Sequence, residues 1–128
     1  MMMMLLFSGA CVHAVPPRRL GDSMREVGTR FERIGRAVLA QRWELASYDA
    51  DELAEIDLSW SHHQSVATLG DAFRTRVLPA LEGAVRRHDA ERAFADTARA
   101  CNECHIAAGM KFLEISTKLG ASVPVIDR

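Results

Sequence analysis

Residues 22–41 read DSMREVGTRFERIGRAVLAQ, and this stretch decides the fold class. Starting just before it, apolar side chains recur at spacings of four and three residues: Leu20, Met24, Val27, Phe31, Ile34 and Val38. Only an α-helix places residues with that spacing on one face. Ser23 and Glu26 have the spacing of a capping box, so we expect a helix over about residues 22–41 that begins at this box.

Two further apolar patterns follow in the chain. A second helix is expected from Trp43 to about His62, with these residues facing inward: Leu45, Leu53, Ile56 and Trp60. A third helix carries Val66, Leu69, Phe73, Val77, Leu81 and Val85 at helical spacing. Pro79 lies within it and lacks the amide hydrogen that a helix interior needs, so we expect the third helix to bend or divide there.

The fourth helix carries the most informative residues. Its inward side is expected to hold Phe94, Thr97, Ala98, Cys101, Cys104, His105 and Ala108. Asp89 is placed to cap its first amides, and Gly109 is placed to end it.

Length and composition fit one compact domain. The chain has 128 residues, 48% of them apolar and only 6% aromatic, which favours helices over a sheet. Four amphipathic helices with short connections hide their apolar faces best as an antiparallel bundle. We therefore predict an all-α protein with an antiparallel four-helix bundle. The formal net charge of −1 gives no attraction to nucleic acid, and no stretch is long enough to span a membrane.

The first fourteen residues predict export. They contain no charged side chain, and they run apolar from Met1 to Phe7 before small residues appear. We interpret residues 1–14 as a signal peptide cleaved after Ala14. The segment is short and lacks an early Lys or Arg, as it would if the true signal were truncated by a misassigned start codon. Lipidation of Cys11 is one alternative, and an unprocessed cytosolic N-terminus is the other. We predict export, and therefore a periplasmic protein.

The decisive motif is Cys101-Asn102-Glu103-Cys104-His105. C-x-x-C-H is the attachment signature of c-type haem. Thiols three residues apart on a helix project from one face and can form thioethers with the two vinyl groups of a porphyrin. The imidazole of His105 then reaches the iron as the proximal ligand. We predict one covalent haem c on Cys101, Cys104 and His105.

Two cysteines at this spacing also occur in dithiol redox centres, zinc sites and disulfides. A dithiol redox centre normally begins a helix in a βαβ unit, and this sequence has none. A structural zinc site needs four ligands, and no second pair with ligand spacing occurs. A disulfide between Cys101 and Cys104 is awkward within a continuous helix. Dithiol chemistry and metal binding remain the alternatives to haem.

The second axial ligand of the iron distinguishes an electron carrier, in which a side chain fills this position, from a gas-binding protein, in which the position is open. Met24 is the leading candidate, because it lies on the inward stripe of the first helix and a thioether is a recognised iron ligand. A methionine at a core spacing is also ordinary packing material. Three histidines are weaker candidates for this ligand, because they are expected near helix ends where imidazoles are often exposed: His62, His63 and His88. Three cations are candidates to pair with the haem propionates: Arg25, Arg33 and Lys111. We find no Ser-His-Asp grouping, P-loop or paired catalytic carboxylates, and expect no enzymatic activity.

The chain resembles the cytochrome c′ class, with an export signal, four helices and a single C-x-x-C-H on the last helix. It is similar to small exported bacterial cytochrome-like proteins that share two motifs: Trp43-Glu44-Leu45-Ala46-x-Tyr48 and Cys101-Asn102-x-Cys104-His105. The likeness spans about residues 20–115. Many members carry an aromatic residue and then arginine three and four residues past the histidine, where this chain has Ala108 and Gly109.

The resemblance implies a haem-binding domain over residues 20–115, with residues 116–128 as a C-terminal tail. It implies thioethers at Cys101 and Cys104, iron bound by His105, and a homodimer through the first two helices. Low-spin relatives use a methionine of the first helix as the second ligand, and Met24 matches that position. High-spin relatives leave the position open and bind nitric oxide or carbon monoxide. We therefore expect a periplasmic electron carrier with redox partner proteins. The alternative is a module that binds a diatomic gas.

Overall fold

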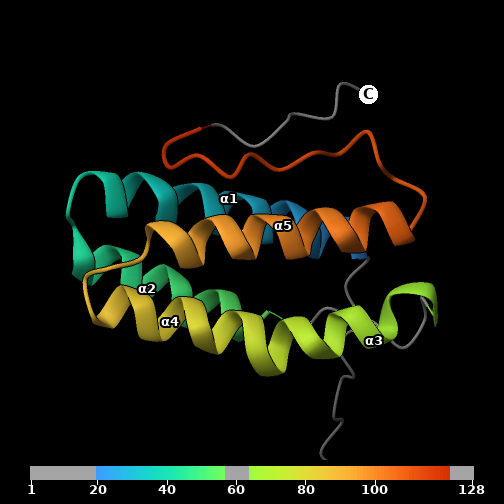
Figure 1. Cartoon of the computed structure of the whole chain (residues 1–128), viewed down its shortest axis with the longest axis horizontal. Helices are drawn as coiled ribbons and strands as arrows, with labels where there is room; N and C mark the ends of the chain where they lie inside the picture. The colour runs from blue at the N-terminus through green and yellow to red at the C-terminus, as the bar shows by residue number, and fades with distance from the viewer. Residues whose placement is uncertain (1–19, 57–63, 122–128) are drawn as a thin grey trace, which may run out of the picture.

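The computed structural model describes residues 20–56 and 64–121, and every regular element in those ranges is a helix (Figure 1). The elements are α1 (Leu20–Leu39), α2 (Trp43–Ala54), α3 (Gln64–Ala72), the π-helical turn η2 (Phe73–Val77), α4 (Leu78–Arg86) and α5 (Glu91–Ala107). Because α3, η2 and α4 follow one another without a break, they form one long bundle helix. With α1, α2 and α5 it forms a bundle in which helices that follow one another in the chain run in opposite directions (Figure 1). The all-α helical bundle prediction is confirmed.

Helix α1 follows its apolar pattern, but its capping box was predicted wrongly. Ser23 lies inside the helix and is only 1% exposed, on the same buried stripe as Val27, Phe31 and Ile34. A hydroxyl buried among core residues one turn inside the helix cannot act as the N-cap. Ser23 therefore belongs to the interior of the bundle.

Two short turns at one end of the bundle are built from left-handed residues. Gln41 and His88 both have φ near 57°. After each of them the chain donates back into the helix it has just left, from Arg42 N to the Ala37 carbonyl and from Asp89 N to the Ala84 carbonyl. This is the Schellman pattern of helix ends. Asp89 thus closes α4, and its predicted role as the cap of α5 is wrong, since no side chain caps α5 at its N-cap, Ala90.

Helix α2 is shorter than its apolar pattern predicts. It starts at Trp43 as expected, but it ends at Ala54 instead of continuing to His62. Asp51 and Glu52 lie in its last turn, which contains no basic residue. Acidic side chains at the negative end of the helix dipole disfavour further helix. The inward residue predicted at Trp60 lies outside the described residues.

At Pro79 the predicted bend or division of the third bundle helix takes the form of a π turn within a continuous helix. Pro79 lies in the first turn of α4, directly after the five-residue π turn η2. The proline ring cannot donate to the Thr75 carbonyl and would clash with it in a regular helix, so the backbone widens into a π turn just before it. The hydroxyl of Thr75 donates to the Asp71 carbonyl at 2.7 Å within the same stretch.

The core is centred on a pair of stacked rings between α1 and α5. The Phe31 and Phe94 ring centroids are 4.2 Å apart with planes 2° from parallel, and the two side chains are 4% and 2% exposed. Gly35 lies one turn beyond Phe31 and leaves room for the Phe94 ring, because a Cβ there would lie 2.8 Å from Phe94 Cζ. Burial of side chains of this size contributes about 1.5–3 kcal/mol each. The pair therefore fixes how α1 lies against α5.

After α5 the chain turns back over the bundle as a C-terminal strap, residues 110–121. Gly109 ends the helix as predicted, with φ of 76° and with Met110 N donating to the His105 carbonyl at 2.7 Å. Figure 1 shows the strap running back along α1 and α5 from the end of α5. Ile115 and Leu119 pack against the core. The packed unit thus extends past residue 115, the boundary predicted for the domain.

Candidate haem site at the end of helix α5

Cys101 and Cys104 lie on the last two turns of α5, and both thiols are free. Cys104 is 9% exposed, and Cys101 is half-buried against the core. Burial raises the pKa of the Cys101 thiol to about 12, and the nearby Cys104 adds to the shift. Burial, and then the Glu103 carboxylate, raise the pKa of Cys104. Both side chains are therefore neutral at physiological pH and suit an apolar partner.

The imidazole of His105 is held by a backbone group of the strap. Its Nδ1 lies 2.7 Å from the carbonyl oxygen of Leu113. A carbonyl oxygen can only accept, so Nδ1 carries the proton and donates it in this bond. In a neutral imidazole the other nitrogen, Nε2, is then left with a lone pair for a metal. His105 is thus prepared as a ligand through Nε2.

The register of α1 against α5 places Met24 level with the cysteines. Figure 1 shows that the two helices run in opposite directions, and the Phe31–Phe94 pair joins them. Met24 lies seven residues before Phe31, and Cys101 lies seven residues after Phe94. Seven residues make two helical turns, about 10 Å along each axis, so both residues lie on the Phe–Phe face at a similar height. Met24 is half-buried and packs against the core.

A buried hydroxyl at the same end of α1 has no hydrogen-bond partner among the described residues. It belongs to Ser23, next to Met24 in the chain. Burying a hydroxyl without a partner is costly, and such groups in folded proteins usually face a bound molecule or water. Two free thiols, an imidazole with an available Nε2, a thioether and an unpartnered hydroxyl are a donor set that fits a haem.

The cations predicted to pair with haem propionates are placed differently from one another. Arg25 pairs with Asp22 at 2.9 Å on the surface, and Lys111 is exposed on the strap. Arg33 Nε lies 3.1 Å from Oδ2 of Asp49, although that contact does not have hydrogen-bond geometry. Arg33 thus pairs with α2, and of the three predicted cations Lys111 is the nearest to His105 in sequence.

Asp49 is the main feature that sequence reasoning missed. Its side chain is fully buried between α1 and α2, and Arg30 donates to its Oδ1 at 3.0 Å. The acidic residues around it suggested a solvated helix face, and Asp49 itself gave no separate signal. Its helical phase could have revealed it, because it lies three residues after Ala46 and four before Leu53, which are both buried. This ion pair joins α1 to α2, and it does not include a residue of the haem motif.

The remaining predicted residues lie away from the motif or outside the described chain. His88 stacks on Trp43 with ring centroids 4.7 Å apart, at the bundle end opposite Cys101. His62 and His63 lie outside the described residues, as do the predicted signal peptide at 1–14, Cys11, and residues 122–128.

Within the described part, no group of three or more His, Cys, Asp and Glu side chains could hold a metal ion. None of its helices is both long and apolar enough to cross a membrane.

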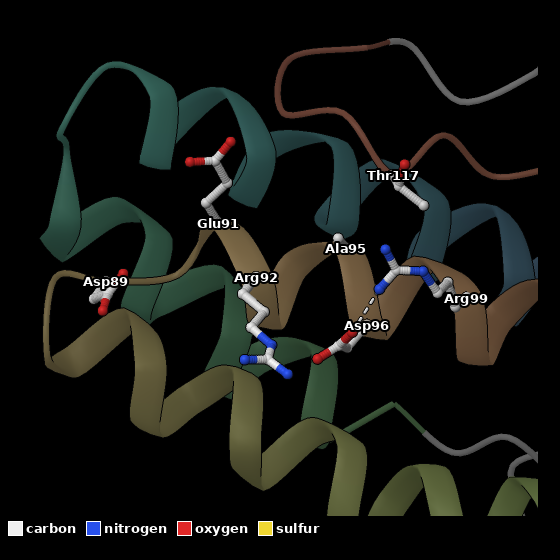
Figure 2. Close-up of a pocket in the computed structure, with 7 residues that line it drawn as sticks. All are labelled: Asp89, Glu91, Arg92, Ala95, Asp96, Arg99 and Thr117. Atoms are coloured by element: carbon white, nitrogen blue, oxygen red, sulfur yellow. Dashed lines mark hydrogen bonds and ion pairs between the residues drawn. The ribbon is translucent and has the colours of Figure 1, made fainter.

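An open polar pocket of about 520 Å³ lies over the first half of α5 (Figure 2). Asp96 and Arg99 on its wall pair at 2.6 Å, and Thr117 of the strap closes one side. None of the haem-motif residues lines this pocket.

No protein-family model, curated protein or solved structure matches this chain, so the assignment of the site depends on its own residues.

Proposed function

We propose that this chain is an exported monohaem c-type cytochrome that transfers electrons in the periplasm. The observation that carries the proposal is the state of the motif: two free thiols on one side of α5, and a histidine whose Nδ1 is occupied and whose Nε2 is available. A dithiol redox centre would require at least one thiol with a lowered pKa, whereas both are raised here. The raised pKa values of the two thiols therefore count against dithiol chemistry.

Each residue has a defined task in this proposal. Cys101 and Cys104 would hold the porphyrin through thioethers, and His105 would bind the iron through Nε2. Met24 would supply a thioether as the second iron ligand. When bound, haem supplies an iron that takes up and returns one electron, with a potential set by axial ligands, hydrogen bonds and exclusion of water. The stacked Phe31 and Phe94 rings close the apolar interior two turns away.

The proposal is tested by expressing the full chain in a host that ligates c-type haem. We expect the purified protein to keep haem on a denaturing gel, to give the pyridine haemochrome spectrum of two thioethers, and to gain the mass of one haem. Cys101→Ser and Cys104→Ser should each remove one thioether. Glu103→Gln, which alters the same motif without changing a proposed ligand, should load normally. A wild-type chain that has the mass of its amino acids alone refutes the proposal.

The role of Met24 needs its own measurement. The described residues contain a second methionine, Met110, which is also half-buried but belongs to the strap on the His105 side. We expect Met24→Ala to convert a low-spin spectrum with a methionine-to-iron charge-transfer band into a high-spin one. Met110→Ala serves as the matched control and should leave the spectrum unchanged. The reverse pattern would assign the ligand to Met110.

A second candidate function is binding of nitric oxide or carbon monoxide at an open iron position. Ser23 favours it, because a buried hydroxyl without a partner suits a small oxygen-bearing ligand. A wild-type ferrous protein that is already high-spin and takes up carbon monoxide readily would support this function over electron transfer.

Both functions are compatible with a homodimer through α1 and α2, where Leu39 and Tyr48 are 64% and 53% exposed. Analytical ultracentrifugation of the wild type and of Tyr48→Ser would test it. A wild-type protein that sediments as a monomer would exclude the dimer.

A further inference from the structure

Asn102 binds the strap by both ends of its side-chain amide. Nδ2 donates to the carbonyl oxygen of Ile115 at 3.0 Å, and Oδ1 accepts from the Ile115 amide at 2.7 Å. The Ile115 N–H can only donate, so the side-chain atom that faces it has to be the oxygen, which fixes the orientation of the amide. Asn102 and Ile115 are half-buried, and one side chain satisfies both backbone groups of one residue.

This contact determines where the Leu113 carbonyl lies. Leu113 is two residues before Ile115 on the strap, and His105 is three residues after Asn102 on α5. The chain between them is a short loop that reverses at Gly109 and closes a turn from Leu113 N to the Met110 carbonyl at 2.9 Å. With the loop held at Ile115, the Leu113 carbonyl is brought to 2.7 Å from His105 Nδ1. The other hydrogen bond described between the strap backbone and α5 near the histidine is at the start of the strap, from Met110 N to the His105 carbonyl at 2.7 Å, so Asn102 supplies the anchor on the far side of Leu113.

We propose that Asn102 is a positioning residue that tunes the iron ligand His105 through the strap. This inference rests on the proposed haem-binding function. A hydrogen bond from Nδ1–H fixes the ring orientation of a ligating histidine and raises the basicity of its other nitrogen. Asn102 therefore strengthens donation from Nε2 to iron and stabilises the ferric state. Its side chain acts through a backbone carbonyl and does not touch the haem ligand itself.

The test compares three variants of the haem-loaded full chain. Asn102→Leu keeps a similar side-chain size but removes both hydrogen bonds. Asn102→Gln keeps the amide on a chain longer by one methylene. Thr117→Ala changes an exposed strap residue and is the matched control. The readouts are the midpoint potential and the iron–histidine stretching frequency. The frequency is measured by resonance Raman spectroscopy on the ferrous proteins in a Met24→Ala background, which leaves iron five-coordinate.

We expect Asn102→Leu to shift the stretching frequency downward and the midpoint potential upward, because a weaker Nδ1–H bond makes Nε2 a poorer donor. Asn102→Gln should show a smaller shift of the same sign, and Thr117→Ala none. A merely structural role for Asn102 would lower thermal stability and leave both spectroscopic readouts at their wild-type values. That outcome would overturn the proposal.

The failures of the two proposals are distinguishable. A wild-type chain without haem refutes the proposed function itself. A wild-type chain that loads haem, together with an Asn102→Leu chain that does not, would also overturn the positioning role. It would assign Asn102 to recognition during haem attachment.

Discussion

Gly35→Ala tests the α1–α5 packing on which the site depends. A methyl group at residue 35 would lie 2.8 Å from Cζ and 3.0 Å from Cε2 of Phe94, where ordinary contacts begin at 3.4 Å. The Phe94 ring is buried and stacked on Phe31, so it cannot move away without losing that stack. Overpacking of this kind costs about 1–3 kcal/mol. The better helix propensity of alanine returns about 0.5–1 kcal/mol.

We therefore expect Gly35→Ala to lower the free energy of unfolding by about 0.5–2 kcal/mol. In a domain of this size that lowers the melting temperature by roughly 2–8 °C. The assay is urea and thermal unfolding followed by far-UV circular dichroism. Gly21→Ala is the matched control in the same helix, because its Cβ would meet nothing within 4 Å. It should be neutral or slightly stabilising.

A double-mutant cycle locates the cause. Phe94→Leu removes the ring atoms that the new methyl group would strike, so in that background Gly35→Ala should lose its penalty. Equal stability of Gly35→Ala and Gly21→Ala, or a full penalty that persists without the Phe94 ring, would refute this account of how α1 and α5 pack.

Three further predictions concern stability and thiol chemistry. Asp49→Asn should cost about 1–3 kcal/mol, because it removes the buried negative charge that Arg30 and Arg33 both contact. Asp51→Asn breaks an exposed pair and should cost under about 1 kcal/mol, and equal costs in urea unfolding would contradict this. Ser23→Ala should stabilise the haem-free chain by about 1 kcal/mol, because it removes a buried hydroxyl that has no hydrogen-bond partner among the described residues. A loss of stability would show that the hydroxyl makes a hydrogen bond in the folded protein. In the folded haem-free chain Cys101 should react with iodoacetamide more slowly than it does in urea at mildly alkaline pH, because its folded pKa is about 12. The unfolded thiol ionises first, so the stability of that chain should fall as pH rises from about 9 toward 12, and a pH-independent stability would contradict the raised pKa.

Local patterns predicted most of the helical framework. The spacing from Val27 to Val38 identified the face of α1, Pro79 located the irregular part of the third bundle helix, and Gly109 located the end of α5. Each of these features acts within a few residues of itself. The errors at Ser23 and Asp89 have a common cause. A polar residue before an apolar run suits a cap, but tertiary packing extended α1 at least three residues ahead of Ser23 and used Asp89 to close α4 instead.

Helix periodicity and motif spacing are properties of consecutive side chains, so they were enough to show that the chain is helical and that two cysteines and a histidine share the last helix. The groups that face these residues depend on how the helices and the strap pack. The Leu113 carbonyl that holds His105 is a backbone group, identical in every residue, so no side-chain pattern could mark it. The level of Met24 relative to Cys101 and the burial of Asp49 likewise depend on how whole helices align. Packing of rings such as Phe31 and Phe94 sets that alignment.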